Sequence, residues 1–278
     1  FWNMNDPWVI EYLSQKVIAF LKELEVGYLK IDYNDNFGVG CDGSESFGEE
    51  NRKQLQGTQR FLQIIRQALP DLVVENCSSG GHRLEPSMMM LTDLSSFSDA
   101  HESLCIPIIG ANMHELIPPR QNLMWAVLRK EAAIEQIYYA MTATFLGRIC
   151  LSGDIKELSD SQWQAVDAGI AFYRKVKDII KSGYSRRFGP PVLSYRDPMG
   201  EQAVIRYGKD GLRALLLLHG FKGARTITVE TEGNYKIVDT YGADVALKKI
   251  GQSFQCRFTN DFQGAAIYLE KVESGDNE

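Results

Sequence analysis

Apolar and polar residues follow two different patterns along this chain of 278 residues, and the change between them falls near Gly183. Before Gly183, stretches with the three-to-four-residue spacing of amphipathic helices alternate with short, continuously apolar runs. This alternation predicts parallel strands that are joined by crossover helices. After Gly183, short runs alternate at period two and are separated by Gly, Asp and Asn residues. The second pattern predicts an antiparallel β-sandwich.

Four helices are predicted before Gly183, at residues 7–21, 50–69, 121–145 and 159–180. Their limits are indicated by start and stop residues, which are Asp6-Pro7, Gly27, Pro70, Gly147 and the capping box Ser159-x-x-Gln162. Buried strands are predicted in the same part at residues 28–33, 72–75, 94–98, 106–109, 114–117 and 149–151. Strands of the second part are predicted at residues 202–207, 213–219, 226–229, 235–239 and 265–269.

The number of buried strands predicts only part of a barrel. About five of them fit a parallel sheet, whereas a complete (β/α)8 TIM barrel needs roughly eight. We therefore predict the α/β class, with residues 1–184 as the C-terminal part of a barrel domain (roughly strands 4 to 8) and residues 185–278 as an antiparallel β-sandwich domain. The chain opens on Phe1-Trp2 without an initiator Met, which is typical of a fragment or a processed product.

Composition narrows the class of protein. Hydrophobic residues make up 44% and charged residues 24% of the chain, as in ordinary soluble globular proteins. The net charge of −6 gives no basic footprint for nucleic acid, and no apolar run approaches the length of a membrane span. The five cysteines are scattered without a Cys-x-x-Cys pair, so we expect neither a zinc site nor a disulfide framework. Scattered cysteines of this kind favour a cytoplasmic location. We expect no cofactor.

Two aspartates lie at the ends of predicted strands. Asp32 comes near the end of the strand at residues 28–33, and Lys30 shares its side-chain orientation at period two. Asp99 follows Phe97-Ser98 at the end of another strand. Because the carboxyl ends of barrel strands face one mouth, both carboxylates can meet there, and two carboxylates are the minimum for cleaving a glycosidic bond. A structural ion pair at Asp32 and a helix N-cap at Asp99 are the simpler alternatives.

A glycine-containing turn follows the strand at residues 72–75. It reads Cys77-Ser78-Ser79-Gly80-Gly81-His82-Arg83, and its glycines can let the backbone approach a ligand closely. The simpler interpretation is a β-to-α turn with a buried cysteine. A phosphate loop is not favoured, because the Gly-Lys-Ser/Thr ending is missing. The long polar loop at residues 34–48 also predicts a functional role, and His114 and Glu115 are weaker candidates for the mouth.

Taken together, three segments resemble the α-galactosidases of glycoside hydrolase family 36. They are Lys30-Ile31-Asp32-Tyr33-Asn34, the turn from Cys77 to Arg83, and Ser98-Asp99. The resemblance implies a retaining mechanism in which Asp32 is the nucleophile and Asp99 is the acid/base, with the two carboxyl groups about 5–5.5 Å apart. It also implies that the substrate is bound by five residues, which are Lys30, Asn34, Cys77, Gly80 and Arg83.

Departures from the family pattern leave the sugar open. Ile31 stands where an aromatic residue is usual, Asp35 where an Arg often follows, and Ala100 where an acid or amide is common. The expected partner is an oligosaccharide with terminal α-galactose. The alternatives are an α-N-acetylgalactosaminidase, a galactosyl-transferring relative, or a carbohydrate-binding module without turnover. Family members carry further sugar-binding residues ahead of this region, so we expect the isolated chain to be inactive. Whether the full-length protein forms a homo-oligomer stays open.

Overall fold

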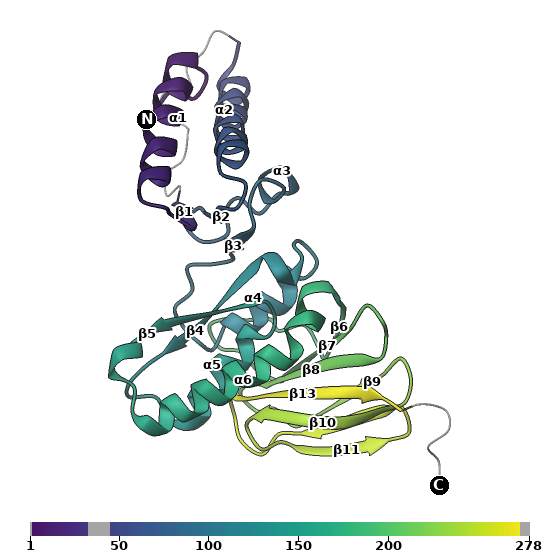
Figure 1. Cartoon of the computed structure of the whole chain (residues 1–278). Coiled ribbons are helices and arrows are strands. Elements are labelled where there is room, and N and C mark those ends of the chain that lie inside the picture. Colours follow the sequence, from purple (N-terminus) through teal and green to yellow (C-terminus); the bar gives the residue numbers. More distant parts are fainter. Residues whose placement is uncertain (1, 33–44, 273–278) are drawn as a thin grey trace. The chain divides into compact units, whose positions relative to one another are not determined.

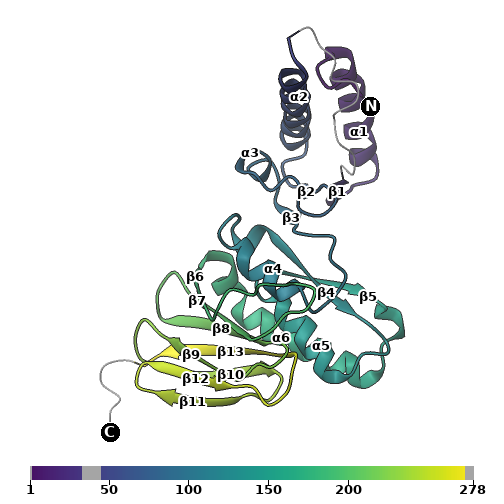
Figure 2. The ribbon, with the colours of Figure 1, turned by 180° about the vertical axis from the view of Figure 1, so that it is seen from behind.

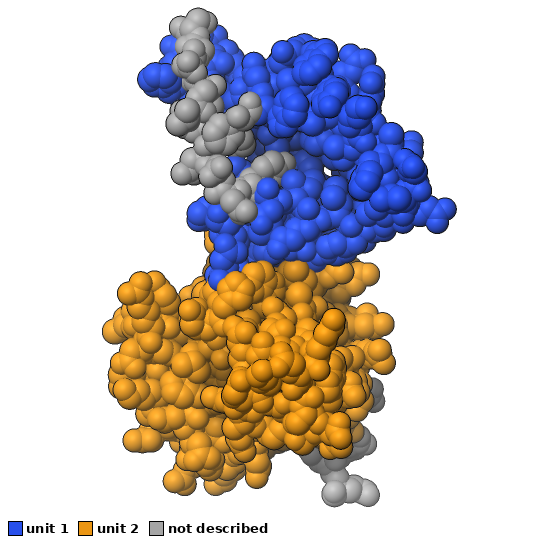
Figure 3. All heavy atoms as spheres, turned by 90° about the vertical axis from the view of Figure 1, so that its left-hand side faces the viewer, with its two compact units in different colours: residues 1–99 blue, residues 100–278 orange. Residues whose placement is uncertain are grey.

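The computed structural model of the chain describes residues 2–32 and 45–272. The chain divides into two compact units, unit 1 at residues 1–99 and unit 2 at residues 100–278, which Figure 3 shows in two colours. The predicted domains at residues 1–184 and 185–278 stay a prediction. Within the described ranges, none of the helices has both the length and the apolar character that a membrane span requires.

In the described residues of unit 1, three parallel strands alternate with three helices (Figure 1). In chain order they are α1 (Pro7–Glu23), β1 (Tyr28–Asp32), α2 (Phe47–Ala68), β2 (Val73–Cys77), α3 (Pro86–Met89) and β3 (Leu94–Ser96). The strands lie in the order β1-β2-β3, and both pairs are parallel. The predicted helices at residues 7–21 and 50–69 and the first three predicted strands are therefore confirmed as elements, whereas Tyr33 lies outside the described residues.

Side chains at both helix starts fix where α1 and α2 begin. The carboxylate of Asp6 accepts a hydrogen bond from the backbone N–H of Trp8 at 2.9 Å, and Pro7 suits the first helical turn. Ser46 caps α2 by accepting from the N–H of Glu49 at 3.1 Å. These contacts satisfy N–H groups that have no partner inside the helix.

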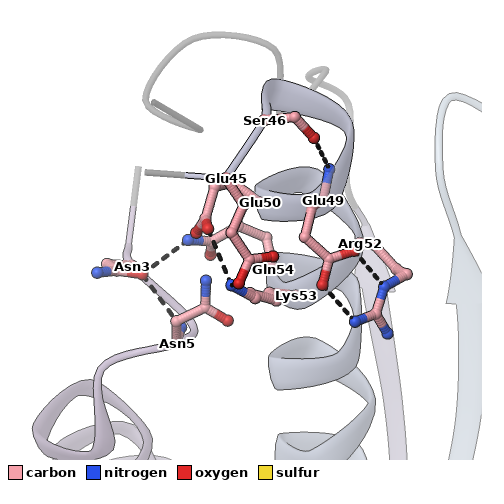
Figure 4. A network of polar contacts seen from close by, with 9 residues as sticks. All are labelled: Asn3, Asn5, Glu45, Ser46, Glu49, Glu50, Arg52, Lys53 and Gln54. Carbon is pink, nitrogen blue, oxygen red and sulfur yellow. Dashed lines mark hydrogen bonds and ion pairs between the residues drawn. The ribbon is translucent and has the colours of Figure 1, made fainter. Parts of the chain in front are cut away.

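A polar network joins the start of α2 to the segment before α1 (Figure 4). The buried Gln54 donates to Oδ1 of Asn3 at 2.7 Å and accepts from the backbone N–H of Met4 at 2.7 Å. Arg52 donates twice to Glu49, at 2.8 and 2.6 Å. The hydrogen bonds of Gln54 tie the segment before α1 to the start of α2, and the two helices pack side by side.

The helix-facing side of the sheet forms the core of unit 1. Leu21 of α1, Ile65 of α2 and Val74 of β2 are buried together. Leu29 and Ile31 of β1 pack against the same cluster. Because side chains alternate along a strand, the residues between them on β1 must point to the other face. That second face carries the polar residues of the candidate site.

The end of α1 differs from the sequence-based prediction. The helix ends at Glu23 rather than being closed by Gly27, and Glu25 adopts the left-handed conformation with φ +50°. The N–H of Val26 donates to the carbonyl of Leu21 at 3.0 Å, a bond that is typical of a helix C-terminus of this kind. The turn was hard to predict because left-handed residues are usually Gly or Asn.

Unit 2 begins with helices and two parallel strands, and continues with two antiparallel sheets. The first elements are α4 (Ile106–Met113), the 3-10 turn η1 (Pro119–Gln121), β4 (Asn122–Leu128), α5 (Ile134–Thr144), β5 (Arg148–Gly153), η2 (Ile155–Glu157) and α6 (Asp160–Ser182). The strands that follow are β6 (Tyr184–Phe188), β7 (Glu201–Tyr207), β8 (Arg213–Gly220), β9 (Thr226–Glu230), β10 (Tyr235–Gly242), β11 (Ala246–Ile250), β12 (Ser253–Arg257) and β13 (Gln263–Lys271).

The two antiparallel sheets have the strand orders β10-β13-β8-β7-β6 and β11-β12-β9. They share one apolar core, in which Leu216 of β8, Val229 of β9 and Phe254 of β12 are buried. Helices α5 and α6 contact β8, β10 and β13 of the larger sheet, and Figures 1 and 2 show them over these strands. All five strands predicted after Gly183 are confirmed, and β6, β11 and β12 were not predicted.

The single helix predicted at residues 121–145 is wrong. The structure has the strand β4, parallel to β5, followed by the shorter helix α5. Every residue of β4 except Trp125 is buried. A strand that is covered on both faces shows no alternation, so its apolar run resembles that of a buried helix. The charged triplet Arg129-Lys130-Glu131 between the two elements was the signal that separates them.

The strands predicted at residues 106–109 and 114–117 are also wrong. The first segment begins helix α4, and the second continues it in turns, with the N–H of Ile117 donating to the carbonyl of Met113 at 3.0 Å. Pro107 lies in the first turn of α4, where the missing N–H costs no hydrogen bond. A proline inside a short apolar run argues against a strand, and this was the signal in the sequence.

Candidate active site

One face of the β1-β2-β3 sheet carries most of the residues that the sequence singled out. In the parallel register, Lys30 of β1 lies beside Glu75 of β2, and Asp32 lies beside Cys77. These side chains point away from the face that packs on α1 and α2. The structure therefore brings Lys30, Asp32 and Cys77 together at the carboxyl ends of two neighbouring strands.

Asp32 and Cys77 are in direct contact although their exposure differs. Asp32 is exposed, whereas Cys77 is 2% exposed. Burial has the largest effect on the pKa of the Cys77 thiol and raises it. The backbone at Gly80 lowers this pKa, the hydrogen bond to Asp32 raises it, and Lys30 and Ser96 lower it by smaller amounts. The thiol is thus protonated near neutral pH, and it can donate to the Asp32 carboxylate.

Lys30 supplies the positive charge of this face. Its side chain is 42% exposed, and Nζ lies 3.7 Å from Oε1 of Glu75. Burial by itself lowers the pKa of Lys30, but the acidic groups around the amine outweigh burial and the pKa is raised. In decreasing order of effect, these groups are Cys77, Glu75, Asp32 and Asp99. Both candidate carboxylates are therefore within electrostatic range of one ammonium group.

The turn after β2 packs directly on the backbone that leads to Asp99. Gly80 has φ +77°, and a Cβ there would lie 2.4 Å from the backbone nitrogen of Asp99. A Cβ on Gly81 would lie 2.3 Å from the carbonyl oxygen of Phe97. Both contacts are too close for a side chain. The glycines that the sequence suggested for ligand approach are thus required by contact between two backbone segments.

Substituting Gly80 should therefore destabilise unit 1. We expect Gly80→Ala to lower the free energy of unfolding by about 2 kcal/mol or more, because the left-handed φ and the contact with Asp99 are both unfavourable for a Cβ. Urea unfolding measures this change. Gly27→Ala is the matched control, since a Cβ at Gly27 meets no atom within 4 Å. Equal stability of the two variants would contradict the assigned role of the turn.

Asn76 holds the two ends of this turn together. Its side-chain amide donates to the carbonyl of Arg83 at 2.5 Å, and Ser95 of β3 donates to the backbone carbonyl of Asn76 at 2.9 Å. Arg83 itself is partly buried. Asn76 was missed in the sequence, because its role depends on a carbonyl that returns to the strand from seven residues away.

Asp99 is exposed and follows the buried Phe97 at the end of β3. The simpler interpretation of Asp99 as the cap of the next helix is wrong, because the residue before α4 that occupies this position is Cys105. The carboxylate of Asp99 therefore has no capping role in α4. The backbone of Asp99 packs on the turn at Gly80, which leaves no room for a side chain at that glycine.

Glu75 is a buried carboxylate that the sequence-based search missed. It is 4% exposed, and it accepts hydrogen bonds from Ser96 at 2.7 Å and from the hydroxyl of Tyr28. The available signal was its spacing, because Glu75 and Cys77 share one face of β2 at period two. An acidic residue within a buried strand also indicates charged or hydrogen-bonding partners nearby, because burial of a carboxylate without them is unfavourable.

The remaining candidates contribute less to this face. Asn34 and most of the loop at residues 34–48 lie outside the described residues. His114 is engaged inside unit 2, where its Nε2 lies 2.8 Å from the carbonyl oxygen of Leu146 and 3.0 Å from the guanidinium of Arg206. Burial, and to a smaller extent Arg206, lowers the pKa of His114 to about 3. His114 is therefore neutral and part of the packing of unit 2.

Comparisons with known proteins give a consistent picture. The Melibiase family model matches residues 1–183. A probable α-galactosidase C of Aspergillus flavus is 23% identical over 287 residues, covering 97% of this chain and 36% of the relative.

Solved structures share the fold. The glycoside hydrolase family 36 α-galactosidase AgaA from Geobacillus stearothermophilus, in a variant bound to 1-deoxygalactonojirimycin, has a TM-score of 0.81 at 18% identity, covering 97% of this chain and 39% of that chain. Another AgaA variant, in complex with raffinose, has a TM-score of 0.79 at 17% identity, with the same coverage. The chain thus spans little more than a third of the length of each of these proteins.

Proposed function

The chain belongs to the melibiase family, and from this membership we propose that it carries the catalytic carboxylates of a retaining α-galactosidase. The observation that supports this proposal most directly is the shared surroundings of Asp32 and Asp99. Both raise the pKa of Lys30, and both are exposed. Asp32 ends β1 and Asp99 follows β3, and these two strands flank β2. Two carboxyl groups that face one site are the equipment for cleaving a glycosidic bond.

In the proposed reaction, Asp32 is the nucleophile. One of its carboxylate oxygens bonds to the anomeric carbon while the bond from that carbon to the leaving oxygen breaks. Asp99 gives its proton to the leaving oxygen, which departs as an alcohol. Water then attacks the anomeric carbon of the Asp32 ester, Asp99 takes a proton from that water, and the Asp32 carboxylate is released. Two displacements at one carbon retain the configuration of the sugar.

The proposed substrate is an oligosaccharide that ends in α-galactose. The binding of raffinose by AgaA, which has the same fold, supports this substrate class. Lys30 and Asn34 would contact sugar hydroxyls, and Cys77 with Gly80 would line the site near the 2-hydroxyl group. Arg83 would support the turn, in line with the hydrogen bond that its carbonyl accepts from Asn76.

The proposed architecture follows from the same membership. The strands β1 to β5 would be roughly strands 4 to 8 of a (β/α)8 barrel. The two antiparallel sheets would form the β-sandwich domain that follows, beginning near residue 185. The parallel pairs β1-β2, β2-β3 and β4-β5 and the apolar core common to the two antiparallel sheets support this assignment.

A panel of nitrophenyl glycosides tests the proposed function. With the protein at its full natural length, we expect release of nitrophenol from the α-galactoside but not from the β-galactoside. Release from the α-N-acetylgalactosaminide instead would identify the alternative hydrolase, and appearance of galactosyl products on added sugar acceptors would identify a transferase. Saturable binding of galactosides without release from any of them would contradict the proposed hydrolase and leave a carbohydrate-binding module.

A further inference from the structure

Glu75 has the properties of a fixed charge beneath the candidate site. Its carboxylate is 4% exposed, and both oxygens have hydroxyl donors: Ser96 donates to Oε1 at 2.7 Å, and Tyr28 donates to Oε2. These two donors come from β3 and β1, the strands on either side of Glu75. Three strands thus hold the carboxylate in one place.

A buried carboxylate is unfavourable by several kcal/mol unless a cation compensates it. Lys30 is that cation, because it lies beside Glu75 in the strand register with its Nζ 3.7 Å from Oε1. Direct ionic hydrogen bonds are about 2.7–2.9 Å long. The ammonium group of Lys30 is therefore held near Oε1 of Glu75 by charge attraction, without a hydrogen bond at that oxygen.

We propose that Glu75 is a positioning residue that holds the Lys30 ammonium on the face of the sheet that carries Asp32, throughout the reaction. This inference rests on the proposed function, and it adds a third carboxylate to the site. In the proposed reaction the negative charge moves, because Asp32 loses its charge on forming the ester while Asp99 gains one on giving up its proton. Lys30 is within electrostatic range of both groups. The charge of Glu75 does not change, so it keeps the ammonium in place in both steps.

The test compares Glu75→Gln, which removes the charge and keeps the shape, with the wild-type protein at its full natural length. The first measurement is the rate at which acetic anhydride acetylates Lys30, followed by mass spectrometry of the peptide. Without Glu75, less negative charge surrounds the amine, so its pKa falls. We expect Lys30 to react about threefold faster or more at a fixed pH below that pKa. Lys22, exposed on α1, is the internal control and should react at an unchanged rate.

The second measurement is turnover of an α-galactoside. We expect kcat/KM of Glu75→Gln to fall by up to about 10²-fold, because a displaced positioning group costs rate even when the reacting groups are intact. Glu75→Asp keeps the charge but shortens the side chain, so its acetylation rate and its kcat/KM should both lie between those of Glu75→Gln and the wild type. If Glu75→Gln does not fold, Glu75→Asp carries the test, with intermediate changes expected in both measurements.

An unchanged acetylation rate of Lys30 in Glu75→Gln would overturn the proposal. If Glu75→Gln does not fold, the proposal is overturned when Glu75→Asp has the wild-type acetylation rate and the wild-type kcat/KM. Failure of the proposed function gives a different result. A wild-type protein that releases no galactose contradicts the hydrolase, yet the acetylation rates still decide whether Glu75 holds the amine of Lys30.

Discussion

Replacing Asp32 by Ala should reduce kcat for an aryl α-galactoside by about 10⁴-fold or more, because no covalent intermediate can form without the attacking carboxylate. Sodium azide should restore part of the rate, since a small anion fits the space that the carboxylate leaves. The azide would attack the same side of the anomeric carbon as Asp32 does. The expected product is therefore the β-galactosyl azide, which NMR distinguishes from the α-anomer.

The control for this variant is Asp71→Ala. Asp71 is also an exposed aspartate of unit 1, but it precedes β2 instead of lying at the carboxyl end of a strand. We expect its kcat to stay within about twofold of the wild-type value, as for most surface substitutions. If Asp32→Ala keeps the wild-type rate, Asp32 has no part in the mechanism. If azide gives no rescue, the loss of rate has another cause, such as misfolding.

Replacing Asp99 by Ala should have an effect that depends on the leaving group. For raffinose, whose leaving sugar needs a proton, we expect kcat/KM to fall by about 10²–10⁴-fold. For a dinitrophenyl galactoside, whose leaving group needs no proton, the first step should be nearly unaffected. The Asp32 ester should then accumulate, because no base activates the attacking water. Stopped-flow release of dinitrophenol should show a burst followed by slow turnover.

Azide separates the role of Asp99 from that of Asp32. In Asp99→Ala, azide would attack the galactosyl ester on Asp32 from the opposite side, so the expected product is the α-galactosyl azide. The two alanine variants should thus give azides of opposite configuration. An equal loss of rate for raffinose and the dinitrophenyl galactoside, without a burst, would show that Asp99 is not the acid/base.

The sequence predicted the elements whose patterns are local. Helices α1, α2 and α6 have clear starts, and strands β7 to β10 and β13 lie between turn residues. The elements predicted with the wrong type fall at residues 106–145, where α4 and β4 are apolar on nearly every side. Burial on all sides removes the periodicity that distinguishes a helix from a strand. Pro107 and the charged residues after Leu128 were the only local signals against the predicted elements.

The candidate site was predictable where it depends on strand ends and not where it depends on pairing between strands. Lys30, Asp32 and Cys77 follow from period two and from the position of each residue at the end of its strand. Glu75 and Asn76 act through the register of β2 with its neighbours, and a single sequence does not specify that register. The catalytic roles of Asp32 and Asp99 themselves stay predictions.

The role of Gly80 and Gly81 likewise depends on a contact between distant segments that a single sequence does not specify. Their spacing after Cys77 was visible in the sequence, but the partner that excludes a side chain is the backbone from Phe97 to Asp99. That contact joins segments almost twenty residues apart. The sequence therefore predicted that Gly80 matters, and only the folded chain gives the physical reason.

The most direct test is to trap the covalent intermediate with a fluorinated α-galactosyl fluoride. The ring fluorine slows both steps by destabilising the positively charged transition state, while the fluoride leaving group speeds the first step, so the ester accumulates. Peptide mass spectrometry of the full-length protein should then find one fluorogalactosyl group, attached to Asp32. A fluorogalactosyl group on any other carboxylate, or hydrolysis that inverts the anomeric configuration with no adduct at all, would contradict the account.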